Sequence, residues 1–261
     1  MLVNQQKTHI VVSKLPRNED YLTNYDGYVV TTEHFDLANP VTKVDDIPDY
    51  EMYSQTINSL NKRFGNRVLK CIEIGYIASE KDRIIDYLAD KDYDLKLLSV
   101  HHNGQFDYLD DEVKDMDPAI VIPQYFAQLS EADVFAHFDY GFRVFGLSVA
   151  EFKQYEAQFL PILDQVIKNK LAFELNAKSA YLYDNLALYE YVIDLYLSRG
   201  GTLFSVGSDG HYLEHFRFHF DDLFALLKAK GVTELANYGS ITSLKNVLSI
   251  KSEDVFLDFF F

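Results

Sequence analysis

The chain has 261 residues, enough to bury a substantial core in one large domain or two small ones. Hydrophobic residues make up 48% of it, with 20 Phe, 19 Tyr and no Trp, a composition typical of a globular protein. The net charge of −16, from 24 basic and 40 acidic residues, repels phosphate backbones and argues against nucleic-acid binding.

Apolar runs typical of strands alternate with helical patterns along the chain. In chain order, the expected elements are strands 9–13 and 27–36, helix 47–64, strand 67–76, a helix starting at 79, strand 94–102, helix 118–130, strand 133–139, helix 149–169, strand 171–176, helix 186–199, strand 202–209, helix 219–230 and strand 233–238. Asp49 is the expected N-cap of the first helix, and Met52 belongs to its expected apolar face. Pro161 is expected to kink or divide the helix that contains it.

The repeated alternation of strands and helices favours a parallel sheet with helices outside it. No linker, low-complexity segment or charge block divides the sequence, so we predict a single domain over residues 1–261. The number of strand–helix units favours a closed (β/α) barrel over an open sheet.

Cysteine content and hydropathy limit the compartment and the kinds of site. The single cysteine, Cys71, excludes an intramolecular disulfide and a cysteine-rich zinc site, and a small buried hydrophobe is its expected role. The first 16 residues contain only a short apolar run, and no stretch approaches the ~20 apolar residues that span a bilayer. We therefore expect a cytoplasmic protein that does not bind membranes and has no signal peptide.

Polar residues recur at or near the C-terminal ends of the predicted strands. They are separated by 28 to 39 residues, about one strand–helix unit each, and comprise His34, Glu73, His101, His137, Glu174 and Asp209. In a barrel the C-terminal ends of all strands open on one face, where active sites are built. These residues are therefore expected to converge although they lie far apart in the sequence.

The residue types at these ends suit a divalent transition metal. Five of the eight histidines lie on or beside them, and neutral imidazoles with carboxylates bind such a metal without any thiolate. Glu73 stands between two isoleucines on a strand, where a carboxylate is costly to bury unless it is paired or metal-bound. In the motif GSDGH, Asp209 and His211 follow a buried strand directly. His102 points to the other side of its strand from His101, which favours a supporting role.

The ordered motifs TTEHFD, CIEIGY, SVHH, AHFDY, FELN and GSDGH resemble those of the PHP (polymerase and histidinol phosphatase) superfamily, and most closely its histidinol-phosphatase branch. The resemblance extends over most of the chain, from about His9 to about Tyr238. It implies a distorted (β/α)7 barrel, a TIM-like fold, with two or three divalent metals, usually zinc, manganese or iron, at the strand C-termini.

The resemblance also implies a set of metal ligands. One metal is expected on His9, Glu73 and Asp209, a second on Glu73, His101 and His137, and a third on His34 and His211. The sequence departs from the superfamily pattern at its start, where KTH replaces His-x-His and Lys7 stands in place of the first histidine. A charged lysine has no lone pair for a metal, but it can supply a cation to a substrate phosphate.

The activity implied by the resemblance is hydrolysis of a small phosphomonoester, with L-histidinol phosphate as the expected substrate. Glu73, Asp209 and His211 are the expected catalytic residues, and Arg143, Lys7 and Lys178 are candidates for binding the phosphate. These cations are needed because the acidic surface would otherwise repel a phosphorylated molecule. For each of them, a solvated surface charge is the alternative interpretation.

Two other interpretations stay open from the sequence. A PHP-type phosphatase could act on another substrate, such as a phosphotyrosine or a sugar or nucleotide phosphate. The altered first motif is also compatible with a catalytically impaired barrel that binds a ligand or partner. A homo-oligomer is possible under each interpretation. The metal content of the purified protein would separate an enzyme from a binding module.

Overall fold

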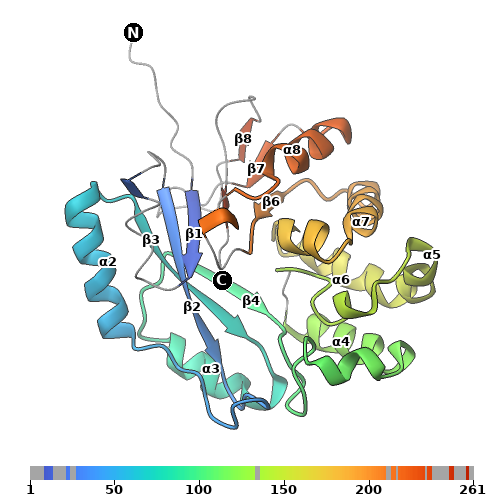
Figure 1. Cartoon of the computed structure of the whole chain (residues 1–261), viewed down its shortest axis with the longest axis horizontal. Helices are drawn as coiled ribbons and strands as arrows, with labels where there is room; N and C mark the ends of the chain where they lie inside the picture. The colour runs from blue at the N-terminus through green and yellow to red at the C-terminus, as the bar shows by residue number, and fades with distance from the viewer. Residues whose placement is uncertain are drawn as a thin grey trace.

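The computed structural model describes residues 9–13, 22–23, 28–132, 136–209, 213–215, 217–232, 234–236, 247–249 and 257–258. Strands β1 to β4 and helices α2 and α3 form one side of the molecule, and helices α4 to α7 form the other (Figure 1). Among the described residues, no helix is long and apolar enough to cross a membrane.

The main sheet is parallel and follows the chain order. Strands β1 (His9–Ser13), β2 (Tyr28–Asp36), β3 (Val68–Gly75) and β4 (Leu95–Ser99) are successive neighbours, and β9 (Leu257–Asp258) pairs in parallel with β1. Strands β5 (Phe173–Asn176) and β6 (Phe204–Gly207) form a separate parallel pair. Strands β7 (Glu234–Ala236) and β8 (Val247–Ser249) form an antiparallel pair.

Helices connect the parallel strands, as the alternating pattern predicted. The α-helices are α2 (Tyr50–Phe64), α3 (Lys81–Leu88), α4 (Pro118–Ala132), α5 (Val149–Phe152), α6 (Glu156–Lys168), α7 (Leu186–Ser198) and α8 (Phe220–Ala229). Short turns of helix are η2 (Ala78–Glu80), η3 (Asp111–Asp115), η4 (Arg143–Phe145), η5 (Lys153–Tyr155), η6 (Lys178–Leu182) and η7 (Leu213–His215).

Helix α2 shows how local sequence sets an element. The Asp49 side chain accepts a hydrogen bond from the Met52 amide and caps the N-terminus, as predicted. Gly65 ends the helix with a φ of 79°, a left-handed conformation that glycine adopts without strain. Ile57 and Leu60 of the expected apolar face are buried, whereas Met52 is 60% exposed and Tyr53 is buried in its place.

The helix predicted at 149–169 is divided, but not at Pro161. The break is the 3-10 turn η5 between α5 and α6, and Pro161 lies inside α6. A capping box at Ser148 and Glu151 starts α5, so the short first helix has its own N-terminal signal.

The strand predicted at 133–139 is not formed by its described part, residues 136–139. The chain bends there, and His137 has a φ of 29°, which lies outside the extended region that a strand requires. No backbone ladder between described residues therefore joins β4 to β5. The parallel α/β architecture is confirmed, whereas the described strands form sheets of five, two and two strands and no closed barrel.

The core lies between the sheets and the helices. One cluster of buried apolar residues extends from Leu22 to Leu235 and is rich in aromatic rings that meet edge to face. Val30 and Cys71 form a small second cluster on the other side of the sheet. Cys71 is fully buried, which raises the pKa of its thiol and confirms its role as a small hydrophobe.

Candidate active site

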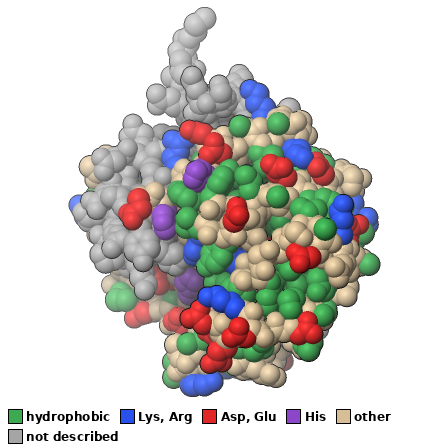
Figure 2. Space-filling model, turned by 45° about the vertical axis from the view of Figure 1, so that its right-hand side comes forward, with side chains coloured by type: hydrophobic (Ala, Val, Ile, Leu, Met, Phe, Trp, Pro, Cys, Tyr) green, Lys and Arg blue, Asp and Glu red, His purple; other side chains and the backbone are tan. Residues whose placement is uncertain are grey.

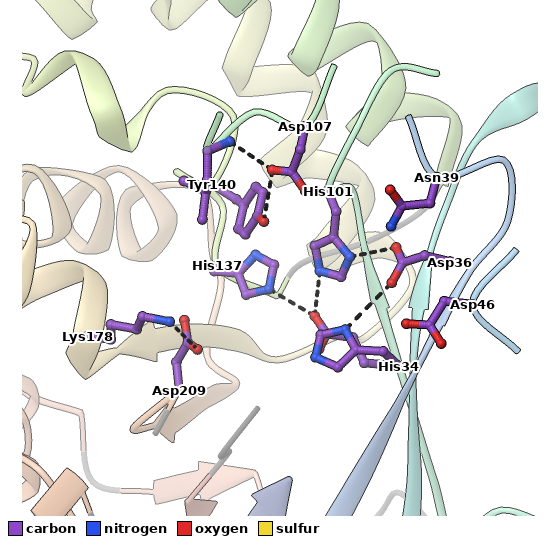
Figure 3. Close-up of a pocket in the computed structure, with 12 residues that line it drawn as sticks. His34, Asp36, Asn39, Asp46, His101, Asp107, His137, Tyr140, Lys178 and Asp209 are labelled. Carbon is purple, nitrogen blue, oxygen red and sulfur yellow. Dashed lines mark hydrogen bonds and ion pairs between the residues drawn. The ribbon is translucent and has the colours of Figure 1, made fainter. Parts of the chain in front are cut away.

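The register of the sheet brings the polar strand ends to one edge. His34 on β2 lies opposite Glu73 on β3, and Gly75 lies opposite Ser99 on β4. A cavity of about 390 Å³ opens there. Its lining consists of His34, Asp36, Asn39, Asp46, Glu73, His101, Asp107, Leu109, His137, Tyr140, Lys178 and Asp209 (Figure 3).

Glu73 is the centre of this edge and is fully buried. Its Oε1 accepts hydrogen bonds from Ser99 Oγ at 2.6 Å and lies 2.8 Å from His101 Nε2 and 3.1 Å from His137 Nε2. Its Oε2 accepts no hydrogen bond from the described residues, and His34 Nε2 is 3.6 Å away. A buried carboxylate oxygen with this environment is suited to bind a cation.

His101 lies between two carboxylates. Its Nε2 faces Glu73, and its Nδ1 is 2.8 Å from Asp36 Oδ1 (Figure 3). Gly75 makes this approach possible, because a Cβ built at that position would be 1.8 Å from Asp36 Oδ1. A carboxylate on the far nitrogen fixes the tautomer and the ring orientation of a metal-binding histidine.

Three groups at this edge meet the distance requirement for a metal site. The ligand atoms of His34, Glu73 and His101 all lie within 4.8 Å of one another. The rings of His34 and His101 are 5.6 Å apart between centroids. Imidazole nitrogens and a carboxylate oxygen form a typical donor set for zinc and related divalent ions.

His137 connects this cluster to the strand pair β5 and β6. Its backbone N–H donates to Glu174 Oε2 at 2.5 Å, while its Nε2 lies next to Glu73. Burial raises the pKa of Glu174 to about 8, and the hydrogen bond from His137 only partly offsets this effect. Glu174 therefore supports His137 from behind and does not line the cavity.

Asp209 lies on the other side of the cavity with a different set of partners. Its Oδ1 accepts from Lys178 Nζ at 3.1 Å, and its Oδ2 accepts from Asn176 Nδ2 at 3.2 Å. Arg143 Nη1 is 3.5 Å from the same Oδ2. Figure 3 shows the Lys178 and Asp209 pair separated from the His34 and His101 side of the cavity.

The pKa values at the cluster follow from burial and opposite charges. Burial opposes the charge on His101, but Asp36 and Glu73 together raise its pKa well above the usual value. Burial likewise opposes ionisation of Glu73, but His101 and His34 hold its pKa well below its usual range. The pKa of His137 is lowered, mainly by burial. The carboxylates are thus ionised and attract positive charge.

The structure brings most of the predicted site residues together. His34, Glu73, His101, His137, Lys178 and Asp209 all line one cavity. Lys7 and His211 lie outside the described residues. His102 is buried beside the site, with its Nδ1 accepting from the Gly104 amide at 3.1 Å, in agreement with a supporting role.

Two predicted site residues do not line the cavity, and their roles stay predictions. His9 is the first residue of β1 and lies level with Tyr28 on β2. Because Tyr28 precedes His34 by six residues, the backbone of His9 is about 20 Å from the C-terminal edge of the sheet. The backbone of His9 therefore lies at the opposite end of the sheet from the cluster. Arg143 is fully buried under Tyr140 and Tyr183 and does not line the cavity, so it is not placed to touch a phosphate.

Several site residues were not identified from the sequence. Asp36 was part of a quoted motif, and its position two residues after His34 on the same strand face was the signal that could have identified it. Ser99 ends β4 opposite Gly75 and donates to Glu73. Tyr140 and Asp107 come from loops, and their contact, 3.2 Å from Tyr140 Oη to Asp107 Oδ1, follows from no periodic pattern.

Figure 2 shows histidine side chains at the surface of the molecule. The side chain of His34 is 36% exposed, so the site is reachable from solvent even though Glu73 itself is buried.

The sequence matches no protein-family profile and no curated protein. The structure is similar to a histidinol phosphate phosphatase from Lactococcus lactis subsp. lactis Il1403, solved with zinc, L-histidinol and phosphate. The TM-score is 0.74 at 19% identity, and the alignment covers 94% of this chain and 99% of that chain. At this identity the likeness shows the fold, and the described strands agree with the parallel α/β part of the expected architecture.

Proposed function

We propose that this chain is a metal-dependent phosphomonoesterase of the PHP type that hydrolyses a small phosphorylated substrate, with L-histidinol phosphate as the best candidate. The observation that carries the proposal is the buried Glu73 carboxylate with three imidazoles around it, at the sheet edge of a fold shared with a histidinol phosphate phosphatase. The likeness of the fold and the chemistry of the donor set support the same function.

The residues present fit a divalent metal. Glu73 Oε2 is buried without a hydrogen-bond donor among the described residues, and the imidazoles of His34 and His101 lie beside it. These three groups would hold the ion, with His137 next to them. When bound, a divalent ion lowers the pKa of water and neutralises charge on phosphoryl oxygens.

The other residues of the cavity would bind and orient the substrate. Lys178 lines the cavity, and its ammonium group would donate to a phosphoryl oxygen of the substrate. Asp36 holds the His101 ring in place from behind, and Ser99 holds Glu73. Both contacts fix the ligand geometry before substrate arrives, which reduces the cost of reorganisation.

The charge of the cavity favours a cationic organic group on the substrate. Asp46 and Asp107 line it in addition to the carboxylates at the cluster. Histidinol phosphate carries an amine and an imidazole, whereas sugar and nucleotide phosphates offer no such cation to these carboxylates. This difference ranks histidinol phosphate above the other phosphomonoesters.

The finer features of the fold are also proposals. Strand β6 lies beside β9, which pairs with β1, and residue 137 reaches Glu174 on β5. These neighbours support a distorted barrel that closes through side chains between β4 and β5. One main apolar cluster from Leu22 to Leu235 supports a single domain. A cytoplasmic location and a possible homo-oligomer stay predictions from the sequence.

The test is metal content and phosphate release measured on one purified sample. After zinc or manganese loading, we expect bound metal and release of phosphate from L-histidinol phosphate, with slower release from phosphotyrosine. Glu73→Gln should lose both bound metal and activity, whereas the exposed Glu112→Gln should keep both. Protein with bound metal but without turnover on either substrate would redirect the search for the substrate. Protein without metal would support a binding module and refute the proposal.

A further inference from the structure

The two carboxylates on opposite sides of the cavity differ in what neutralises them. Glu73 faces imidazoles, which can give up their protons and then offer lone pairs to a metal. Asp209 faces the ammonium of Lys178 and the guanidinium of Arg143, neither of which has a lone pair to offer. Among the described residues, the group that could hold a metal contains Glu73 and does not contain Asp209.

Hydrogen bonding shows the same contrast. Both Asp209 oxygens accept from protein donors, Oδ1 from Lys178 and Oδ2 from Asn176. Glu73 Oε2 accepts none from the described residues. A metal at Glu73 therefore meets a carboxylate oxygen, Oε2, that accepts no hydrogen bond from the described residues. A metal at Asp209 has to approach the positive charges of Lys178 and Arg143.

The guanidinium beside Asp209 is locked in position. Arg143 is 2% exposed, and its guanidinium carbon lies 5.1 Å from the ring centroids of both Tyr140 and Tyr183. Its Nη2 is 3.4 Å from Asp139, which is itself held by Ser179, Asn185 and Tyr189. These contacts hold the Arg143 guanidinium beside Asp209.

Lys178, in contrast, is partly open to the cavity. Its side chain is 19% exposed and lines the cavity, and its ammonium has three N–H donors. Asp209 accepts one of them. The remaining donors are available to an oxygen of a molecule in the cavity.

Among the described residues, two cations lie beside the carboxylates of this group: Arg143 pairs with Asp139 and Asp209, and Lys178 pairs with Asp209. A divalent ion next to Asp209 would meet both cations at close range, and like charges repel strongly in a buried environment.

We propose that the Lys178 ammonium, and not a metal ion, neutralises Asp209, and that this ammonium is the cation that binds the phosphoryl group opposite the metal cluster. The inference changes the expected role of Asp209 from a metal ligand to the residue that positions Lys178. Its second part, the phosphoryl group, rests on the proposed function.

Metal content tests the first part. We expect Asp209→Asn to bind as much zinc per chain as the unchanged protein, whereas Glu73→Gln binds less, by elemental analysis after dialysis. Loss of zinc in Asp209→Asn would overturn the proposal. If that variant does not fold, Lys178→Met decides in its place: zinc content that is unchanged or higher supports the proposal, and a loss of zinc overturns it.

Binding of inorganic phosphate tests the second part. By calorimetry on zinc-loaded protein, Lys178→Ala should weaken phosphate binding at least tenfold, and Lys178→Arg should restore most of it. Lys230→Ala is the matched control, because Lys230 also pairs with an aspartate, Asp194, on helices that do not line the cavity. Equal phosphate affinity in Lys178→Ala and the unchanged protein would refute this role. Neither assay uses histidinol phosphate, so a wrong substrate and a wrong role for Lys178 give different results.

Discussion

Asp139→Asn should destabilise the protein more than any exposed charge substitution. Asp139 is fully buried and accepts hydrogen bonds from Arg143, Ser179, Asn185 and Tyr189. An asparagine at this position removes the charge that compensates the buried guanidinium and turns an N–H₂ group toward these donors. Breaking a buried ion pair in this way costs about 3–5 kcal/mol, a large part of the ~5–15 kcal/mol that stabilises a typical domain.

Urea denaturation followed by circular dichroism measures this loss as a lower midpoint with an unchanged slope. Asp164→Asn is the control, because Asp164 pairs with Arg199 on the surface and the loss of such a pair costs less than about 1 kcal/mol. If the two variants lose equal stability, or if Asp139→Asn loses less than about 1 kcal/mol, the buried network does not have the role assigned to it.

Three further predictions concern the metal cluster and its support. Gly75→Ala should weaken zinc binding about 10–100-fold in a chelator competition, because the added Cβ displaces Asp36 from His101. Unchanged zinc affinity would contradict the close approach of Asp36 to Gly75. Zinc binding near pH 7 should release a proton from His101, because Asp36 and Glu73 raise its pKa against the effect of burial. Calorimetry in buffers of different ionisation enthalpy measures this proton release. Glu174→Gln should stabilise the metal-free protein increasingly as pH rises from about 5 to 8, because burial raises the pKa of Glu174 from 4.5 to about 8. The expected gain in the free energy of unfolding is about 3 kcal/mol at pH 7. A gain that does not change with pH would refute this prediction.

The parallel α/β architecture could be predicted from the sequence because each strand and helix has a local signal. Apolar runs marked β2, β3, β5 and β6, and the cap Asp49 marked the start of α2. The segment around His137 was the exception. Its apolar residues predicted a strand, but contacts to Glu174 and Glu73 hold it in a bent conformation that depends on tertiary structure.

The histidines and acids of the cluster could be found because they end successive strands. Residues whose role depends on strand register or on tertiary packing could not be found from the sequence. The role of Ser99 depends on its position opposite Gly75, and the burial of Arg143 depends on Tyr140 and on Tyr183 from a distant loop. The strand pattern alone already put His9 at the start of β1, where it lies level with Tyr28, and its role as a ligand was implied only by the resemblance.

Among the described residues, no backbone hydrogen bonds join β4 to β5. Side chains of the candidate site connect these strands instead. Side chains bridge this interval: Ser99 and His137 both contact Glu73, and the His137 amide contacts Glu174. The candidate metal cluster therefore also connects β3 and β4 to β5 through side-chain contacts. An ion bound to His101 and Glu73 would strengthen this connection. Its removal should therefore increase amide hydrogen exchange at residues 136–140 before exchange increases in the rest of the core.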